Sequence, residues 1–514
     1  MASTIADTVP VTTDGKSPGR KERVVILGSG WAGYAFARTL DPRKYERIMV
    51  SPRSYFVFTP LVAGTAVGTL EFRAVIESVR RLGLDHYYQG WADDVDFARK
   101  VVRVEAHTSG DLTSRTTTPP PPLPRQVTTT DEMEKGKGPM FDLPYDKLVV
   151  AVGAYAQTFG IEGVKQHANF LRDVGDARRI RMKILQRFET ASLPITTDAE
   201  RRKLLHFAVV GGGPTGIEFA AELHDLVRDD LRKTYPDMVE LVKITVYDVA
   251  PKVLPMFDQK LAQYAMDTFR RERIAVKTEH RLTRIRPDDD CAGCLRLRFR
   301  EYGDEEEVGA GIVVWSTGLK QNPLIQKLGS KVFEERLSVA GEEEEEEEES
   351  ISGGAAMQQL QLQMDAKTGG IVTDAHLRVV TTVPQQAPEK PGGEQQDVSV
   401  LPDVYSIGDC AVVAGERYPA TAQVASQQAT YLAKRLNRGD LETRPFRFRN
   451  WGVMTYLGSW RAIHQSGADE LTGRAAWFLW RTAYLTKSMT IRNKIMVPVY
   501  WFMSWLFGRD ISRF

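Results

Sequence analysis

Short apolar runs, each followed by a glycine-rich turn and a helical pattern, recur along the chain. Residues 24–27 and 207–210 are strand-forming runs, and each leads directly into the pattern G-x-G-x-x-G. The turns consist of Gly28, Ser29, Gly30, Trp31, Ala32 and Gly33 in the first case, and of Gly211, Gly212, Gly213, Pro214, Thr215 and Gly216 in the second. In such a turn the first glycine reverses the chain, the second lets the backbone approach a pyrophosphate, and the third lets helix pack closely on strand. Since both turns follow a strand, the pattern predicts two dinucleotide-binding sites.

The alternation of strand and helix continues after each turn and predicts an α/β fold with two Rossmann-like domains. Residues 47–51 are expected to form a second strand, and residues 59–68 an apolar, glycine-rich loop. Apolar runs that end in small residues follow at 147–154, 311–318 and 403–409. Their order indicates that one nucleotide domain is inserted into the other. The expected limits are 22–190 with 365–440 for the first domain, 200–325 for the second, and 441–514 for a C-terminal region.

Several segments have compositions typical of unfolded chain. Residues 107–139 are rich in Thr and Pro, residues 335–363 include the glutamate run 342–349 and a Gln-rich stretch, and residues 382–399 are rich in Pro, Gln and Glu. Such segments bury too little apolar surface to offset the entropy of ordering. We expect them to be disordered surface insertions, and residues 1–21 to be a disordered N-terminal segment.

The composition of the chain excludes several classes of function. The chain has 514 residues, a net charge of +1 and 26% charged residues, so nothing global indicates nucleic acid. Its three cysteines exclude a disulfide scaffold and suit a reducing compartment. Cys291 and Cys294 lie in a polar, Asp-rich stretch with no second pair, so we expect no zinc site and no other metal. No apolar stretch is long enough to cross a bilayer, and the N-terminus is a poor mitochondrial presequence.

Residues at the strand ends indicate which dinucleotides bind. Asp248 ends a strand of the second domain, where an acid accepts hydrogen bonds from the adenosine ribose and repels a 2′-phosphate, which favours NADH. The equivalent place in the first domain holds Ser51, Pro52 and Arg53, and an arginine there is ambiguous because it could meet a phosphate. Asp409 is placed to bond the ribityl chain of a flavin, or to cap a helix, and the two roles can coexist.

Together these motifs resemble the type II NADH:quinone oxidoreductase family, in its fungal mitochondrial form. The segments that carry the resemblance are 28–33, 51–61, 209–218, 254–258, 422–429 and 456–459, which span nearly the whole chain apart from the insertions. The Ser-Pro-Arg-x-Tyr-Phe and Ala-Gln-x-x-x-Gln segments are far more specific than the glycine turns. The resemblance implies the two-dinucleotide-domain fold of glutathione-reductase-like flavoproteins, with C-terminal membrane-associated amphipathic helices.

The resemblance also implies cofactors and site residues. Non-covalent FAD would bind in the first domain and NADH in the second, and a hydride would pass to the flavin before two electrons reach ubiquinone without proton pumping. Glu218 would position the nicotinamide or handle a proton, and Gln423 and Gln427 would meet the flavin and the quinone. The implied FAD site comprises residues 28–33 with Ser51, Pro52, Arg53, Thr59, Gly153, Asp409 and Gln423. The implied NADH site comprises residues 211–216 with Glu218, Asp248, Thr317 and Gly318, and the quinone site Gln423, Ser426 and Gln427.

Two features depart from the family pattern. Related fungal sequences often carry His where this chain has Ser426, and a serine cannot donate a proton to the quinone in the way a histidinium can. The family also implies a peripheral protein of the mitochondrial inner membrane, whereas the N-terminus has no clear targeting sequence.

The C-terminal residues are basic and amphipathic. From Arg474 to Phe514 there are seven Lys or Arg and one acid. Trp477, Trp480, Tyr484, Ile491, Ile495 and Val499 have the spacing of one helical face, and Pro498 is expected to start a second, shorter helix. This pattern favours a helix lying in a membrane surface, and a buried dimer or domain interface is the alternative. The family implies both membrane binding and a homodimer.

Other classes of flavoprotein differ from this chain in the positions of their cysteines or in their rate of catalytic turnover. Disulfide reductases need a cysteine pair soon after the first glycine turn, and residues 34–58 contain none. Sulfide:quinone oxidoreductases place cysteines beside the flavin, and here only Cys410 follows Asp409. A slow NADH-binding flavoprotein that signals through assembly remains the other alternative.

Overall fold

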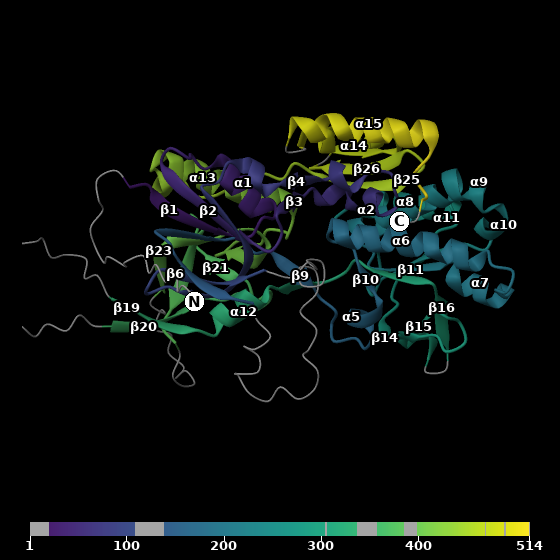
Figure 1. The fold of residues 1–514 in the computed structure, drawn as a ribbon, viewed down its shortest axis with the longest axis horizontal. Coiled ribbons are helices and arrows are strands. Elements are labelled where there is room, and N and C mark those ends of the chain that lie inside the picture. The colour runs from purple at the N-terminus through teal and green to yellow at the C-terminus, as the bar shows by residue number, and fades with distance from the viewer. Residues whose placement is uncertain are drawn as a thin grey trace, which may run out of the picture.

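The computed structural model describes residues 20–107, 138–303, 306–336, 357–384, 398–467, 469–487 and 490–512. Figure 1 shows two α/β halves side by side, with a helical C-terminal segment along one edge. Residues 1–19, and most of the segment 107–139 that the composition assigned to an insertion, lie outside the described residues.

The first half is built on a large mixed sheet. Its strands follow the order β19-β20-β22-β23-β8-β1-β2-β5-β6-β7, with β21 and β24 attached at one side. The strands are β1 (Glu22–Leu27), β2 (Tyr45–Ser51), β5 (His86–Asp96), β6 (Val101–Ala106), β7 (Met140–Pro144), β8 (Lys147–Val150), β19 (Val332–Arg336), β20 (Met357–Leu362), β21 (Ile371–Thr373), β22 (Arg378–Thr382), β23 (Val398–Ser406) and β24 (Ala411–Val413). The central strands β23, β8, β1, β2 and β5 are parallel. Helices α1 (Trp31–Thr39) and α13 (Ala422–Arg438) pack together over β1 (Figure 1).

The second half has a smaller parallel sheet. Its order is β10-β17-β11-β12-β13, with bounds Asn169–Phe170, Ile312–Trp315, His206–Val210, Lys243–Tyr247 and Ala275–Lys277 respectively. Helices α6 (Val174–Ala191), α7 (Asp198–Leu204), α8 (Pro214–Leu226) and α11 (Gln259–Arg271) belong to this half. A three-stranded antiparallel sheet adjoins it, formed by β14 (Leu282–Pro287), β15 (Leu295–Phe299) and β16 (Glu307–Ala310).

The C-terminal region joins the two halves at one edge. It contains a three-stranded sheet of β25 (Val453–Gly458), β26 (Arg461–Ser466) and β27 (Asp469–Thr472), followed by α14 (Gly473–Lys487) and α15 (Ile491–Phe507). Strand β25 packs on α8 of the second half, and α15 contacts the first half near residues 72–74. The region therefore borders both predicted nucleotide sites.

Short elements complete the described chain. The paired strands are β3 (Tyr55–Val57) with β4 (Ile76–Ser78), and β9 (Ala154–Ala156) with β18 (Leu319–Gln321). The short helices are η1 (Thr59–Leu61), α2 (Val62–Ala66), η2 (Phe72–Ala74), η3 (Val79–Leu82), α5 (Val164–His167), η4 (Val227–Leu231), α9 (Arg232–Thr234), α10 (Pro236–Val239), η5 (Arg300–Tyr302), α12 (Pro323–Gly329), η6 (Gly408–Cys410) and η7 (Leu441–Thr443).

Three segments differ from the sequence-based expectation. Residues 59–68 form η1 and α2 rather than a loop, because Pro60 starts the turn and the apolar residues after it are buried. Within 335–363, residues 357–362 form β20, which pairs with β19 and buries Leu360 and Leu362. Within 382–399, the two ends belong to β22 and β23. Composition averaged over a segment hid these short alternating runs.

The C-terminal stripe is also divided differently from the expectation. The helix break falls between Lys487 and Ile491, where the Thr490 side chain caps α15, and Pro498 lies inside α15. Trp480 is buried whereas Ile491 and Ile495 are exposed, so the predicted stripe does not lie on one face. When helical spacing is counted across a break, residues of two different helices are assigned to one face. The assignment fails because the second helix starts in a new orientation.

Candidate functional site

The first glycine turn has the geometry that its three glycines predict. Gly28 has φ 108°, and a Cβ built on it would lie 2.4 Å from the Ala151 carbonyl oxygen. A Cβ on Gly33 would lie 1.9 Å from the Gly28 carbonyl oxygen, which is how helix α1 comes close to β1. A Cβ on Gly30 would meet nothing within 4 Å. The backbone at Gly30 therefore borders open space at the start of a helix, where a phosphate group would fit.

The second turn repeats this geometry. Gly211 has φ 117°, and a Cβ on Gly216 would lie 2.0 Å from the Gly211 carbonyl oxygen. A Cβ on Gly213 would again meet nothing within 4 Å. The first glycine of each turn also donates its N–H to the end of the neighbouring strand, Gly28 to Val50 and Gly211 to Tyr247, at 2.8 Å in both cases.

One cavity of about 590 Å³ lies between the two turns. Its size is within the range of small-molecule and cofactor sites. The predicted site residues that line it are Gly28, Ser29, Gly30, Trp31, Ala32, Ser51, Pro52, Arg53, Thr59, Gly153, Pro214, Thr215, Glu218, Thr317, Gly318 and Asp409. Those that do not line it are Gly33, Gly211, Gly212, Gly213, Gly216, Asp248, Gln423, Ser426 and Gln427. The structure thus brings residues from both nucleotide halves to one space.

Asp409 faces this cavity from a short turn, not from a helix cap. It lies in η6, whereas the N-cap of α13 is Thr421. Burial raises the pKa of Asp409, and the nearby Arg172 guanidinium opposes that shift. The turn is fixed by the buried Gln428, whose side-chain oxygen accepts a hydrogen bond from the Gly408 N–H at 2.8 Å. Sequence reasoning missed Gln428, which sits one residue beyond the predicted pair of glutamines.

Arg53 is held by a buried acid. Its Nη1 lies 2.6 Å from Oδ2 of Asp173, and the Tyr55 hydroxyl donates to Oδ1 of the same carboxylate at 3.0 Å. Burial alone would raise the pKa of Asp173. The Arg53 charge and the hydrogen bonds lower this pKa by more than burial raises it, so the net shift is downward. The arginine at this strand end therefore has a partner within the protein, and no 2′-phosphate is needed to explain its presence. Asp173 was not singled out from the sequence because it lies 120 residues from its partner.

Asp248 closes the second turn. Its side chain accepts hydrogen bonds from the Gly212 N–H and, at 2.7 Å, from the Ala250 N–H. The carboxylate therefore sits directly after β12 and beside the middle of the glycine turn. This is the place from which an acid can meet an adenosine ribose.

Glu218 is buried at the inner end of the cavity. Its Oε1 accepts from the Tyr456 N–H at 3.1 Å and from the Trp480 Nε1–H at 3.2 Å. Burial raises the pKa of Glu218 to about 8, which the two hydrogen bonds partly offset. The carboxyl group can therefore gain or lose a proton near neutral pH. Trp480 and Tyr456 had no predicted role at the site, because they come from the C-terminal region.

The amides of Gln423 and Gln427 bond to a nearby backbone segment. Gln423 donates to the Gly452 carbonyl at 2.7 Å and accepts from the Trp451 N–H, and Gln427 makes the same pair of bonds with Arg449. The two side chains thus lie on one face of α13, as their spacing predicts. That face meets residues 449–452 rather than the cavity, which α13 lines through Ala422 and Ala425.

Tyr484 of α14 reaches the cavity from the C-terminal region. It lines the space together with Met454, and its ring centroid lies 6.1 Å from that of Phe58. A helix with exposed apolar residues therefore borders the same cavity as the two glycine turns. No helix among the described residues is both long and apolar enough to cross a membrane.

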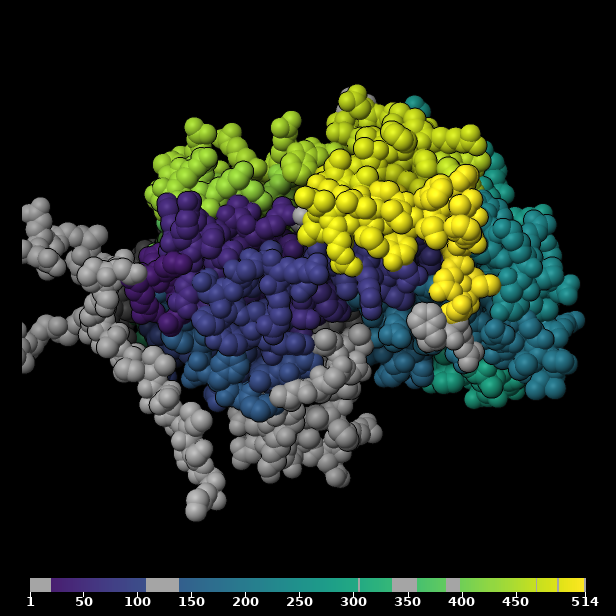
Figure 2. Space-filling model, turned by 45° about the horizontal axis from the view of Figure 1, so that its top comes forward, coloured from purple at the N-terminus to yellow at the C-terminus, as the bar shows by residue number. Residues whose placement is uncertain are grey.

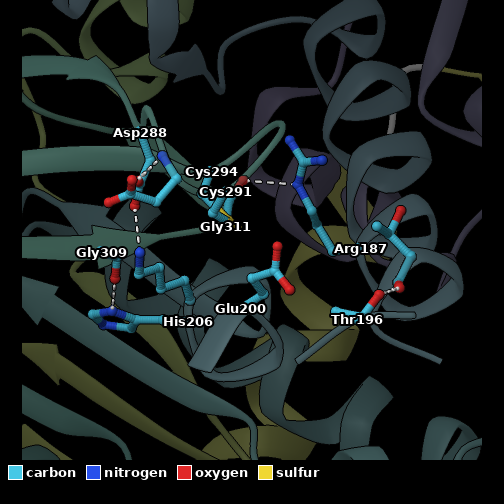
Figure 3. Close-up of a disulfide and its surroundings, with 12 residues drawn as sticks. Arg187, Thr196, Glu200, His206, Asp288, Cys291, Cys294, Gly309 and Gly311 are labelled. Carbon is cyan, nitrogen blue, oxygen red and sulfur yellow. Dashed lines mark hydrogen bonds and ion pairs between the residues drawn. A yellow bond between two sulfur atoms is a disulfide. The ribbon is translucent and has the colours of Figure 1, made fainter. Parts of the chain in front are cut away.

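The cysteines do not lie at the cavity. Cys291 and Cys294 lie in the turn between β14 and β15, as the polar, Asp-rich stretch predicts, but there they are buried and joined in a disulfide that the sequence did not indicate. Figure 3 shows the disulfide beside Arg187, whose Nε donates to the Gly311 carbonyl at 2.9 Å. Cys410 is a free, buried thiol. Within the described chain, no group of three or more metal-ligating side chains comes together.

The chemistry of this site fits two dinucleotides. Each turn offers an open backbone at its second glycine, and Asp409 and Asp248 supply one acid to each half. FAD would be held by the first turn, Arg172 and Asp409, and NADH by the second turn with Asp248 and residues 315–319.

Comparisons with known proteins agree with this architecture. Residues 22–344 match the family model "Pyridine nucleotide-disulphide oxidoreductase", and residues 451–510 match "NDH2 C-terminal domain". A "Probable NADH dehydrogenase" of Dictyostelium discoideum is 35% identical, with 96% of this chain and 91% of that protein covered. An "External alternative NAD(P)H-ubiquinone oxidoreductase B3, mitochondrial" of Arabidopsis thaliana is 31% identical, with the same coverage.

Solved structures show the same fold. "Structure of NDH2 from plasmodium falciparum in complex with NADH" superposes with a TM-score of 0.74 at 24% identity, covering 96% of this chain and all of that one. A sulfide:quinone oxidoreductase of Aquifex aeolicus superposes less closely, with a TM-score of 0.58 at 15% identity and coverage of 95% and 96%.

Proposed function

Because this chain belongs to the type II NADH dehydrogenase family, we propose that it is an FAD-dependent enzyme that oxidises NADH and reduces ubiquinone. The observation that carries the proposal is the cavity of about 590 Å³ that residues of both glycine turns line, and that Tyr484 of the C-terminal region also borders. Bound FAD supplies the chemistry that takes up a hydride and returns two electrons. The protein's part is to orient the two dinucleotides and to handle the proton.

The two halves divide the binding work. The first turn would hold the FAD pyrophosphate at Gly30, while Asp409 would meet the ribityl chain and Arg172 would balance its charge. The second turn would hold the NADH pyrophosphate at Gly213, with Asp248 on the ribose. Glu218 would lie where the nicotinamide and the flavin meet, since it lines the cavity from the start of α8.

The glutamines of α13 are proposed to act on the quinone side. Their amides fix residues 449–452, and the strand that follows carries Met454 to the cavity. Ser426 lies between them on the same helix and can relay a proton only through its hydroxyl or water.

The protein is proposed to bind a membrane surface through α15. Asn493, Val497 and Trp501 form its buried face, four residues apart, while Ile491, Ile495, Phe502, Trp505 and Phe507 are exposed. In Figure 2 the C-terminal residues, in yellow, form one continuous part of the surface. Exposed apolar side chains beside Arg492 and Lys494 match a helix that lies in a lipid interface. The quinone would then reach Tyr484 from the lipid.

We also propose an oligomeric state and a compartment. Phe478 and Leu479 of α14 are also exposed and would suit a homodimer contact. The names of mitochondrial relatives support a mitochondrial location, and we propose a peripheral position on the inner membrane within it. Phe478→Ser should weaken the dimer in sedimentation, whereas Trp505→Ser with Phe507→Ser should weaken flotation with anionic vesicles. If the Trp505 and Phe507 substitutions leave flotation intact, the membrane proposal fails.

An anaerobic experiment tests the electron path. Purified protein is mixed with NADH while the flavin absorbance is followed, and a short-chain ubiquinone is then added. Fast bleaching followed by fast recovery is the expected result. Bleaching without recovery would contradict the quinone acceptor, and no bleaching with NADH would contradict the donor. Sulfide would be the next donor to try, although none of the three cysteines lines the cavity.

A further inference from the structure

Helix α8 carries three buried acids beyond the second glycine turn. Glu218, Glu222 and Asp225 follow one another at spacings of four and three residues, so they lie along one face of the helix. Buried acids need compensation, because burial of an unpaired charge is costly. Asp225 is compensated by hydrogen bonds. Its carboxylate accepts one from the Tyr456 hydroxyl at 2.6 Å and one from the Ser459 N–H at 3.0 Å.

A small cavity lies between the first two acids. It measures about 10 Å³ and is lined by Glu218 and Glu222 together with Pro60, Gly64, Thr69, Tyr456, Trp480 and Trp501, among others. This is about the space that the centre of one water needs. A Cβ on Gly64 would lie 3.2 Å from Oε1 of Glu222, so the glycine leaves room beside this carboxylate. Glu218 also lines the large cavity, so it separates the two spaces.

The second carboxylate oxygen of Glu222 is hydrogen-bonded to a polar side chain. Its Oε2 accepts from the Thr69 hydroxyl at 2.7 Å, and that hydroxyl accepts from Nε of Arg509 at 3.0 Å. Arg509 also pairs with Asp230 at 2.7 Å. The side chains of Glu222 and Arg509 are about 8% and 11% exposed, so the polar groups around Glu222 are not completely closed off from water.

The groups around Glu222 keep it able to titrate. Burial raises the pKa of Glu222; Arg509, the Thr69 hydroxyl and Arg481 lower it, and Asp225 on the same helix raises it. The net direction is upward, as for Glu218. Two neighbouring acids with raised pKa values and a water-sized space between them are suited to exchange a proton.

The proposed reaction needs such a route. NADH, quinone and one proton from solution give NAD⁺ and quinol, so each turnover draws a proton from water while NADH supplies both electrons. Resting on the proposed function, we propose that Glu222 relays this proton from solvent to Glu218 through one water in the small cavity. Glu218 first gives its proton to a quinone oxygen as the quinone takes up its electrons, and so becomes a carboxylate. The water then gives a proton to the Glu218 carboxylate, and the Glu222 carboxyl gives its proton to the water. Glu222 is then reprotonated from solution.

The test compares acceptors that differ in their need for protons. Glu222→Gln keeps the shape of the side chain but cannot relay a proton. With ubiquinone as acceptor, the reoxidation rate should fall by roughly 10²-fold, the lower end of general acid–base effects. Ferricyanide takes electrons without protons, so its reduction by NADH should stay within about twofold of the unmodified enzyme. Glu222→Asp retains a carboxyl group and should recover part of the quinone rate.

Controls separate a relay from a structural effect. Asp237→Asn removes an exposed carboxylate farther along the chain, in α10, and should leave both rates unchanged. An unchanged quinone rate in Glu222→Gln would overturn the relay. Equal losses with both acceptors, or a Glu222→Asp variant as slow as Glu222→Gln, would also overturn it. If the unmodified enzyme reduces ferricyanide but not ubiquinone, the proposed function itself fails, and the relay with it.

Discussion

The two nucleotide halves share one backbone turn but are completed in different ways. In the second half, the turn, Asp248 and residues 315–319 all come from one continuous stretch of chain. In the first half, the turn is completed by Arg172 and Asp173, which lie between β10 and α6 of the second half, and by Asp409, which follows β23 after the whole second half. The comparison teaches that the geometry of each glycine turn is set locally, while the remaining contacts depend on how the chain returns.

The largest effect should come from the third glycine of the first turn. Gly33→Ala would place a Cβ 1.9 Å from a backbone carbonyl oxygen, so helix α1 must move away from β1. We expect a loss of more than about 4 kcal/mol of stability and no bound flavin. Gly30→Ala meets nothing within 4 Å and should keep the fold while weakening flavin binding. Thermal unfolding and flavin content measure the two effects separately.

The second half provides a matched pair for this prediction. Gly216→Ala and Gly213→Ala should repeat the contrast, with loss of fold in the first variant and a raised KM for NADH in the second. If Gly33→Ala retains flavin as well as Gly30→Ala does, the two turns do not depend on close helix–strand packing, and the comparison breaks.

The next effect sharpens the difference between the halves. Asp173→Asn leaves Arg53 without its buried partner, and breaking such a pair costs about 3–5 kcal/mol. Because the folded-state pKa of Asp173 is lowered, its contribution is present above the ordinary Asp pKa of about 4 and is lost as the pH falls through the folded value. Urea unfolding at neutral and acid pH should show the two proteins differing at pH 7 and converging at low pH. A constant difference across pH would contradict the ion pair.

The sequence was enough to place the features that depend on local patterns. Both turns, Asp248 and Asp409 follow directly from strand ends, and the family's motifs pointed to FAD, NADH and quinone. Sequence reasoning missed Asp173, Gln428 and Trp480, because each is defined by a partner outside its own helix or turn, 120, 20 and 262 residues away respectively. Spacing along α13 correctly put Gln423 and Gln427 on one face, but spacing cannot say what that face meets.

A third prediction concerns a feature of the second half. Cys291 and Cys294 close a loop of few residues, for which the chain-entropy model gives about 2 kcal/mol. Cys291→Ala with Cys294→Ala should therefore lower stability by no more than about 2 kcal/mol. Dithiothreitol should lower the unfolding temperature of the unmodified protein and leave that of the double variant unchanged. A reductant effect of equal size in both proteins would mean that the effect does not come from this disulfide. Cys410→Ala is the control for the free thiol.

The smallest effect should fall on nucleotide choice, where the halves differ by one acid. The Gly212 and Ala250 N–H groups bond to different oxygens of Asp248, so Asp248→Asn keeps an acceptor for one of them and removes the negative charge that would repel a 2′-phosphate. We expect the preference for NADH over NADPH in kcat/KM to fall roughly tenfold, which corresponds to about 1.4 kcal/mol. Flavin content should not change, because Asp248 lies outside the cavity that the first half lines. Equal use of NADH and NADPH by the unmodified enzyme would contradict the role of Asp248, and a loss of flavin in the variant would show that the two halves are not separable in the way their geometry indicates.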